Sequence, residues 1–107
     1  MNVDFKLLLT KNGNAIISKG KYKLLKEVDK SGSLNAASKA MGLSYKKAFS
    51  YIKSIEENLG ENVLIRTPGK ASILSPKGIE IIKMYDFFYN ELKKFTKEKL
   101  NEYKNKE

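Results

Sequence analysis

The sequence predicts a mainly α-helical domain with small β-hairpins, an α+β fold. Three observations support this class: apolar residues recur with helical spacing in several segments, short apolar runs are followed by turn residues, and 107 residues suffice for one modest core. No apolar run approaches the ~20 residues of a membrane span, and the N-terminus lacks the features of an export signal. We therefore expect a single soluble domain in the cytoplasm, without membrane association.

Residues 1–18 predict an N-terminal β-hairpin. Apolar residues stand at every second position from Phe5 to Leu9, which is the spacing of one strand face. The pair Asn12-Gly13 favours a type I′ turn because both residue types accept a positive φ. The apolar run at residues 15–17 then supplies the second strand.

Residues 19–74 are expected to form the body of the domain and to begin with two helices. Apolar spacing predicts the first over residues 20–31, ended by Ser31-Gly32. Ser33 is a suitable N-cap for the second, which reaches Met41. The small residues that let a neighbouring helix cross this one closely are Ala36, Ala37 and Ala40.

A third helix is predicted after the turn at Gly42, with Ser44 as its N-cap. The apolar stripe of this helix consists of Ala48, Ile52, Ile55 and Leu59. The opposite side consists of Lys46, Ser50, Lys53 and Glu57. Tyr45 and Phe49 lie along one border of the stripe, and Lys47 lies along the other. Lysines near the start of a helix anchored by aliphatic residues are typical of a recognition helix, whose first side chains enter the DNA major groove. The alternative is an ordinary solvated lysine face.

A second small hairpin, or wing, is predicted after this helix. The β-rich run at residues 63–65 and the segment Ser72-Ile73-Leu74 flank the turn sequence at residues 67–70, which has Pro-Gly at its centre. Arg66 and Lys70 flank the tip, where they can reach phosphates or a minor groove. The alternative is that both residues only keep an exposed turn soluble.

A long helix is predicted over residues 75–100, because Ser75 is a suitable N-cap and Pro76 favours the first turn. Residues 101–107 are expected to form a frayed tail. The apolar residues of this helix cover more than one stripe, which predicts contact with its own core on one side and with a second copy of the chain on another. The predicted dimer interface consists of Ile79, Ile82, Tyr85, Phe88, Tyr89, Leu92 and Phe95. The alternative is a monomer whose N-terminal hairpin covers the extra surface.

The composition excludes most enzyme chemistry. The chain has no cysteine and no histidine, which removes disulfides, thiolate nucleophiles, imidazole bases and the usual zinc ligands. Glu56, Glu57 and Glu61 form an acidic helix end without an apolar pocket or a partner base. We expect no enzyme, no cofactor and no metal site, and the net charge of +9 suggests a polyanionic partner.

Three runs of the sequence together resemble a known family. They are SGSLNAASKAMGLSYKKAFSYIKSIEENLG at residues 31–60, VLIRTPGK at 63–70 and ILSPKGIEIIKMYDFF at 73–88. In this order they resemble the N-terminal winged helix-turn-helix domain of ModE-type molybdate-responsive transcription regulators, which are related to the DNA-binding domain of LysR-type regulators. The resemblance implies a domain that dimerises through its N- and C-terminal segments and places the helix from Ser44 to Leu59 in the major groove.

The resemblance matches Ser44, Tyr45, Lys46 and Ser50 to the start of the recognition helix and residues 67–70 to the wing. The wing has one glycine here, where the family has a glycine-rich loop. Full-length family members continue into domains that bind molybdate or tungstate, and this chain stops before such a domain. Binding of molybdate or tungstate is therefore not expected within this chain.

The sequence thus predicts a homodimeric transcription regulator that binds double-stranded DNA sequence-specifically through a winged helix-turn-helix. The predicted DNA-binding residues are Ser33, Ser44, Tyr45, Lys46, Lys47, Ser50, Lys53, Arg66 and Lys70. Two alternatives are an architectural protein that binds DNA without sequence preference, and a protein-interaction module that uses the aromatic C-terminal helix.

Overall fold

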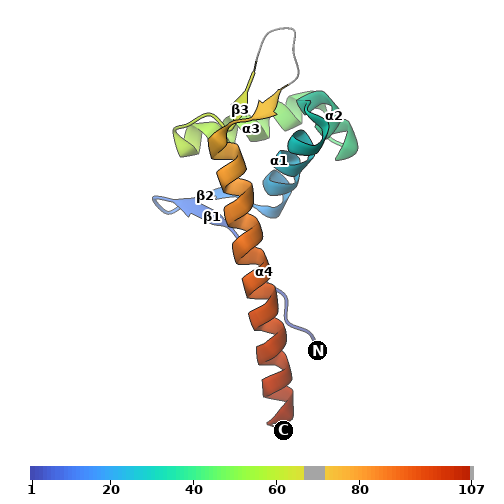
Figure 1. Ribbon diagram of the computed structural model, residues 1–107, viewed down its shortest axis with the longest axis vertical. Helices are drawn as coiled ribbons and strands as arrows, with labels where there is room; N and C mark the ends of the chain where they lie inside the picture. The colour runs from blue at the N-terminus through green and yellow to red at the C-terminus, as the bar shows by residue number, and fades with distance from the viewer. Residues whose placement is uncertain (67–71, 107) are drawn as a thin grey trace.

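The chain folds into a body of three helices and two small hairpins, from which a fourth helix extends as a long stalk (Figure 1). The computed structural model describes residues 1–66 and 72–106. In chain order the elements are β1 (Leu9–Lys11), β2 (Asn14–Ile17), α1 (Lys19–Ser31), α2 (Leu34–Ala40), α3 (Tyr45–Leu59), β3 (Leu64–Ile65), β4 (Ile73–Leu74) and α4 (Pro76–Asn105). This arrangement confirms the predicted α+β class and the winged helix-turn-helix order.

The N-terminal hairpin forms with the predicted turn but with a shorter first strand. Asn12 has φ 52° and Gly13 φ 80°, as a type I′ turn requires. The strands β1 and β2 are antiparallel, and Leu9 is paired with Ile17. The first strand cannot continue back to Phe5, because it would need a partner beyond Ile17. The residue after β2, Ser18, is already the N-cap of α1. Residues before Leu9 run beside α4 instead (Figure 1).

The predicted serine caps are present at three helix starts. The side-chain oxygen of Ser33 accepts the backbone N–H of Ala36, and that of Ser44 accepts the N–H of Lys47. Ser75 caps α4 in the same way through the N–H of Gly78. Each cap satisfies a backbone donor that has no partner within its helix, which stabilises the helix by about 1 kcal/mol.

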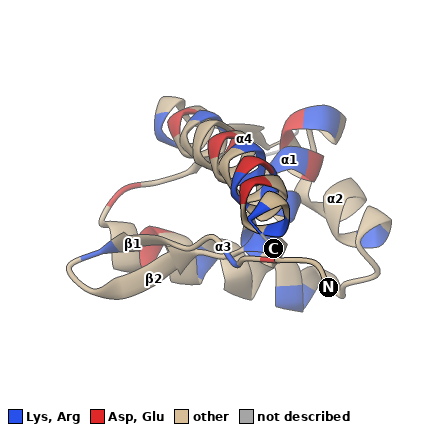
Figure 2. Ribbon diagram, turned by 90° about the horizontal axis from the view of Figure 1, so that it is seen from below, with Lys and Arg blue, Asp and Glu red and all other residues tan. Residues whose placement is uncertain are grey.

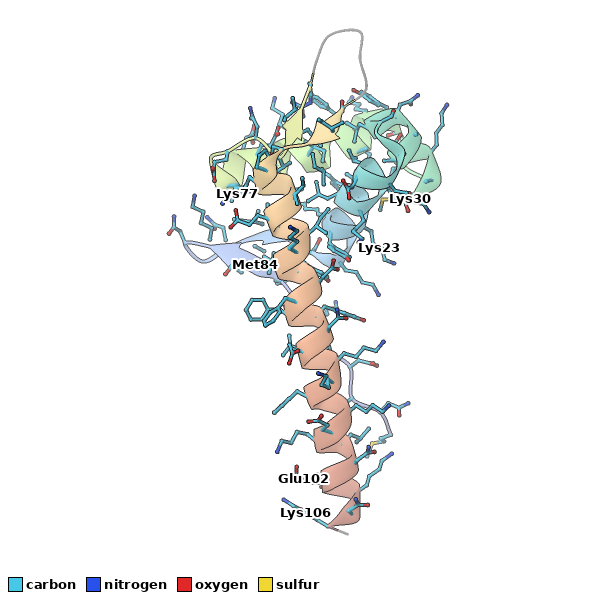
Figure 3. All side chains as sticks on the ribbon, in the orientation of Figure 1. Lys23, Lys30, Lys77, Met84, Glu102 and Lys106 are labelled. Carbon is cyan, nitrogen blue, oxygen red and sulfur yellow. The ribbon has the colours of Figure 1, made fainter. Side chains whose placement is uncertain are left out.

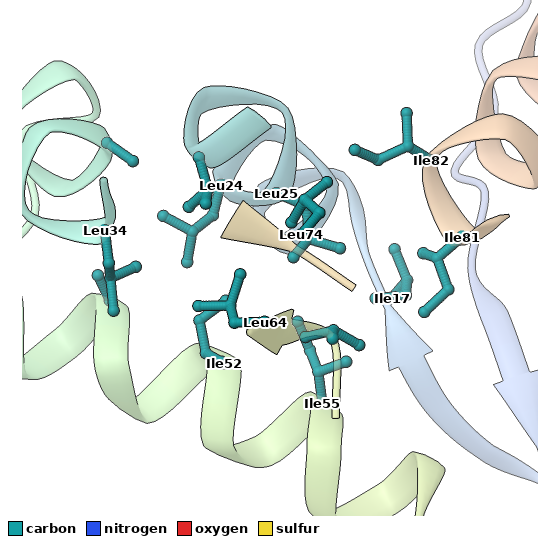
Figure 4. Packing of buried hydrophobic residues seen from close by; sticks show 14 of the residues in the cluster. Ile17, Leu24, Leu25, Leu34, Ile52, Ile55, Leu64, Leu74, Ile81 and Ile82 are labelled. Atoms are coloured by element: carbon teal, nitrogen blue, oxygen red, sulfur yellow. The ribbon is translucent and has the colours of Figure 1, made fainter. Parts of the chain in front are cut away.

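One core holds the body together and receives side chains from every helix and from both hairpins (Figure 4). Its fully buried aliphatic residues include Leu24 and Leu25 of α1 and Ile52 and Ile55 of α3, all at 0% exposure. Burying each such side chain stabilises the folded state by about 1.5–3 kcal/mol relative to leaving it exposed. Leu64 and Leu74, a cross-strand pair in the wing, are buried in the same core, so the wing is fixed to the body at its base.

The stalk differs from its prediction in two ways. Helix α4 continues to Asn105, beyond the predicted end at residue 100, and ion pairs along the last turns, such as that between Lys99 and Glu102, support this extension. Only the first part of α4 packs on the body, where Ile82 and Tyr85 are buried. Within the described residues, none of the helices combines the length and apolar character needed to cross a membrane.

Candidate nucleic-acid interface

The α2–α3 pair is joined by a tight turn that orients α3 across the body. Gly42 has φ 67°, in the left-handed region that glycine adopts without strain. The backbone N–H of Leu43 donates to the carbonyl of Ser38 at 2.9 Å, which closes the turn. Ser38 itself is buried, and its hydroxyl donates to the carbonyl of Asn35 at 2.7 Å. The short second helix and this turn therefore present α3 as a fixed element.

Helix α3 separates an apolar side from a polar side, as its spacing predicts. Ala48 and Ile52 are at 0% exposure in the core. Lys46, Ser50 and Lys53 are exposed on the other side. The start of α3 adds the partial positive charge of a helix N-terminus to these lysines, and both attract phosphate.

The predicted DNA-binding residues Ser33 and Ser44 lie at the starts of α2 and α3 as their N-caps. The oxygens of Ser33 and Ser44 are used as caps, and each hydroxyl keeps its own proton for donation. Tyr45 is exposed in the first turn of α3. Lys47 is also exposed, and its Nζ lies 5.9 Å from the ring centroid of Tyr51 on the same helix.

Arg66 lies differently from its prediction as a residue flanking the wing tip. Its guanidinium is 5.3 Å from the ring centroid of Phe49, and its Nη2 is 3.3 Å from Oε1 of Glu56. Both partners belong to α3, so Arg66 is folded back onto the helix because they offer it an anion and an aromatic face. Lys70 and the predicted wing tip at residues 67–70 lie outside the described residues.

Glu56 has a structural role that its place in the sequence does not indicate. Its Oε2 accepts the backbone N–H of Val63 at 2.9 Å and that of Leu64 at 3.4 Å, while Oε1 pairs with Arg66. Glu56 therefore ties α3 to the base of the wing. Its place in a run of acidic residues gave no signal for this role, because the contact depends on how the chain returns after α3.

The predicted dimer residues of α4 fall into two groups. Ile79, Phe88, Leu92 and Phe95 are exposed, and Tyr89 is half-buried against Phe5, with their ring centroids 5.4 Å apart. Ile82 and Tyr85 are buried in the core of their own chain, and this corrects their assignment to an exposed interface. Two further exposed apolar residues extend the free side of α4 and are Met84, labelled in Figure 3, and Phe87.

Charged residues are distributed differently on the two long helices. Acidic and basic residues are interspersed along α4 (Figure 2), and several of them form ion pairs within the helix. The first half of α3 contains lysines without a carboxylate. Its first acidic residue is Glu56, which is bound to the wing. No cluster of residues suited to hold a metal ion occurs within the described ranges.

Comparison with known proteins identifies the family of this chain. Residues 20–79 match the family described as bacterial regulatory helix-turn-helix protein, lysR family. A sequence comparison with curated proteins found no match.

Solved structures with a similar fold include the following three. The CbnR DBD in a complex with DNA has a TM-score of 0.63 and 17% identity, covering 77% of this chain and 93% of that one. VV2_1132, a LysR family transcriptional regulator, has a TM-score of 0.59 and 19% identity, covering 69% of this chain and 25% of that one. ArgP from Mycobacterium tuberculosis has a TM-score of 0.55 and 23% identity, covering 78% of this chain and 30% of that one. The present chain thus spans about a quarter of VV2_1132.

Proposed function

The chain belongs to the LysR family of bacterial regulatory helix-turn-helix proteins, and we propose that it acts as a homodimer that places α3 in the major groove of a partly palindromic DNA site. Membership of this family makes it a DNA-binding domain of a transcription regulator and not an enzyme. The homodimer, the contacting residues and a cytoplasmic location are parts of the proposal.

The observation that carries the proposal is the exposed side of α3. Lys46, Ser50 and Lys53 project from a helix whose other side is locked in the core. Lysines that approach phosphates release counterions, which supplies affinity for any sequence. Tyr45, Lys46, Ser50 and Lys53 are the residues that we propose to read base edges.

The wing and the two cap serines complete the proposed contact surface. Ser33, Ser44 and Lys47 are proposed to donate to phosphates, and their position at the starts of α2 and α3 supports this. Lys70 is proposed as a phosphate contact from the wing on the basis of its sequence position alone. Arg66 is proposed to act mainly by holding Phe49 and the wing in place, since its guanidinium is already occupied.

The homodimer is supported by the free side of α4. Phe88, Leu92 and Phe95 recur at helical spacing and are exposed in the single chain. A second copy of α4 would cover them and would hold two α3 helices at one fixed separation, about 34 Å for half-sites one DNA turn apart. Occlusion of a promoter is the simplest outcome of such binding.

The closer resemblance to ModE-type regulators is also part of the proposal. It is supported by the order and spacing of Ser31-Gly32-Ser33, of residues 42–46 and of residues 74–78. Molybdate and tungstate are not proposed as ligands of this chain.

The test is selection of bound sequences from random double-stranded DNA, with the affinity for the winners measured at two salt concentrations. Enrichment of an inverted repeat, bound with steep salt dependence, is the expected result. Salt-dependent binding without enrichment would favour an architectural protein. No DNA binding would favour a protein-interaction module and contradict the proposal.

Lys46→Ala tests the assignment of base reading. We expect it to weaken binding to the selected site by about 1–3 kcal/mol and to relax the preference at one position. Lys104→Ala, the same charge change near the far end of α4, is the matched control and should preserve the preference. An unchanged preference profile in Lys46→Ala would reassign Lys46 to phosphate contact.

A further inference from the structure

Two aromatic side chains stand exposed in the first half of α3. Tyr45 is 54% exposed and Phe49 is 38% exposed. They are one helical turn apart, and their ring centroids are 6.3 Å apart with the ring planes inclined by 21°. Covering apolar surface is favourable, so a pair of open rings beside the lysines of a recognition helix indicates a contact that the bound DNA completes.

The Phe49 ring is held by the base of the wing. The Arg66 guanidinium lies over the ring at 5.3 Å from its centroid and is paired with Glu56 at 3.3 Å. Glu56 is anchored in turn, because its Oε2 accepts the backbone N–H of Val63 at 2.9 Å. A ring that is already immobilised loses little conformational entropy when it meets a ligand. The contacts therefore hold Phe49 in place and leave 38% of the residue exposed.

The neighbours of Phe49 on α3 bring it to the DNA. Lys46 precedes it by three positions and Lys53 follows it by four, so both lie beside Phe49 on the helix surface. All three side chains are exposed. When the two lysines approach the major groove, the Phe49 ring arrives at the edge of the same groove.

The chemistry of the major groove determines what the ring can contact there. Most groups on the base edges are hydrogen-bond donors or acceptors, which lose water without a replacement when an apolar ring covers them. The C5-methyl group of thymine is the apolar exception. We infer that Phe49 contacts this methyl group and selects a T·A pair at one position of each half-site. The inference rests on the proposed function and adds to it a residue and the base that this residue reads.

The test replaces each thymine of the selected site by uracil, one at a time. Uracil pairs in the same way as thymine and lacks only the methyl group. For the unmodified chain we expect the affinity to fall about fourfold at one thymine of each half-site, the effect of leaving one methyl group uncovered. For Phe49→Ala the same replacement should have no effect at that position. Phe49→Leu, which keeps an apolar side chain, should retain part of the sensitivity.

The possible outcomes separate this inference from the proposed function. Tight binding to a selected site without loss at any uracil would overturn the inference and leave the function intact. Equal sensitivity to uracil in the unmodified chain and in Phe49→Ala would assign the methyl group to another residue and overturn it as well. Failure to select any sequence would overturn both. Unchanged circular dichroism and unchanged affinity for random DNA would show that Phe49→Ala has kept the fold.

Discussion

Helices α3 and α4 both have apolar stripes, but they differ in how far their own chain covers them. The apolar stripe of α3 is buried, with Ala48, Ile52 and Ile55 at 0% exposure. The stripe of α4 is buried only in its first part, at Ile81, Ile82 and Tyr85. Its exposed apolar residues include Met84, Phe87, Phe88, Leu92 and Phe95.

The difference supports the proposal that α3 contacts DNA and that α4 associates with a second copy of the chain. A domain of this size has a core that can cover about one side of each packed helix. Helix α3 buries its apolar side in that core, and its polar side stays exposed to solvent, where a charged ligand can reach it. Helix α4 extends beyond the body (Figure 1) and has exposed aromatic residues there, the surface that we propose a second copy to cover.

The largest expected effect tests the association side of this comparison. Phe88 is 45% exposed in the single chain, so Phe88→Glu should leave the monomer folded. If a second copy covers this position in the dimer, Phe88→Glu would bury an unpaired charge there. The dimer would then be destabilised by about 3–5 kcal/mol. We expect a shift from dimer to monomer in light scattering and a loss of affinity for the inverted repeat, with binding to a single half-site retained.

The matched control is Asn90→Glu, an exposed position two residues along α4 that faces away from Phe88. It should remain a dimer. If Phe88→Glu also remains a dimer, the free side of α4 is not the interface and the comparison between the two helices loses its functional meaning.

Much of the fold follows from local signals in the sequence. The caps at Ser33, Ser44 and Ser75, the turn at Asn12-Gly13 and the stripe of α3 depend on residues within a few positions of one another, so periodicity and capping rules suffice to predict them. The exposed side of α3 follows from the same spacing.

The remaining features depend on contacts between distant segments. The bond between Glu56 and Val63 and the return of Arg66 to α3 require the wing to be placed first. The burial of Ile82 and Tyr85 depends on which side of α4 meets α1 and the hairpins. Spacing alone identified apolar residues on α4, but it could not divide them between the core and the free surface.

The next effect concerns the first turn of α4, where the helix packs against the base of the wing. A Cβ atom at Gly78 would lie 2.5 Å from the carbonyl oxygen of Val63, which already accepts the backbone N–H of Ser75 at 2.9 Å. Because both the oxygen and the helix are backbone, neither can move freely. We expect Gly78→Ala to lower the free energy of unfolding by about 1–3 kcal/mol, although alanine favours helices.

Gly20→Ala in α1 provides the control, since a Cβ atom there meets nothing within 4 Å. It should be neutral or stabilising by at most about 1 kcal/mol. Chemical denaturation of both variants measures the difference. Equal stability of the two would mean that the start of α4 is held loosely, and that the body and the stalk are less firmly joined than the contacts at Val63 indicate.

The smallest effect concerns the contact between α1 and α4, where the body meets the stalk. The Tyr22 hydroxyl donates to Oδ1 of Asp86, and its ring stacks on Tyr85 with centroids 4.1 Å apart. Lys26 lies 3.8 Å from the other carboxylate oxygen. Burial, followed by the hydrogen bond and charge of Asp86, raises the pKa of Tyr22 to about 12. We expect Tyr22→Phe to cost about 1 kcal/mol at neutral pH through loss of this hydrogen bond.

The stability that Tyr22 contributes should decrease at alkaline pH. The folded state favours the neutral phenol, because its pKa lies above the ordinary value of 10. The contribution of Tyr22 is therefore complete below about pH 10 and is lost as the pH rises towards 12, so thermal stability should fall more steeply in this range for the unmodified chain than for Tyr22→Phe. Tyr103→Phe, at a residue 65% exposed near the end of α4, should follow the unmodified chain. Parallel curves for Tyr22→Phe and the unmodified chain would mean that Asp86 does not hold the phenol, and that Tyr22 contributes to this contact through aromatic packing alone.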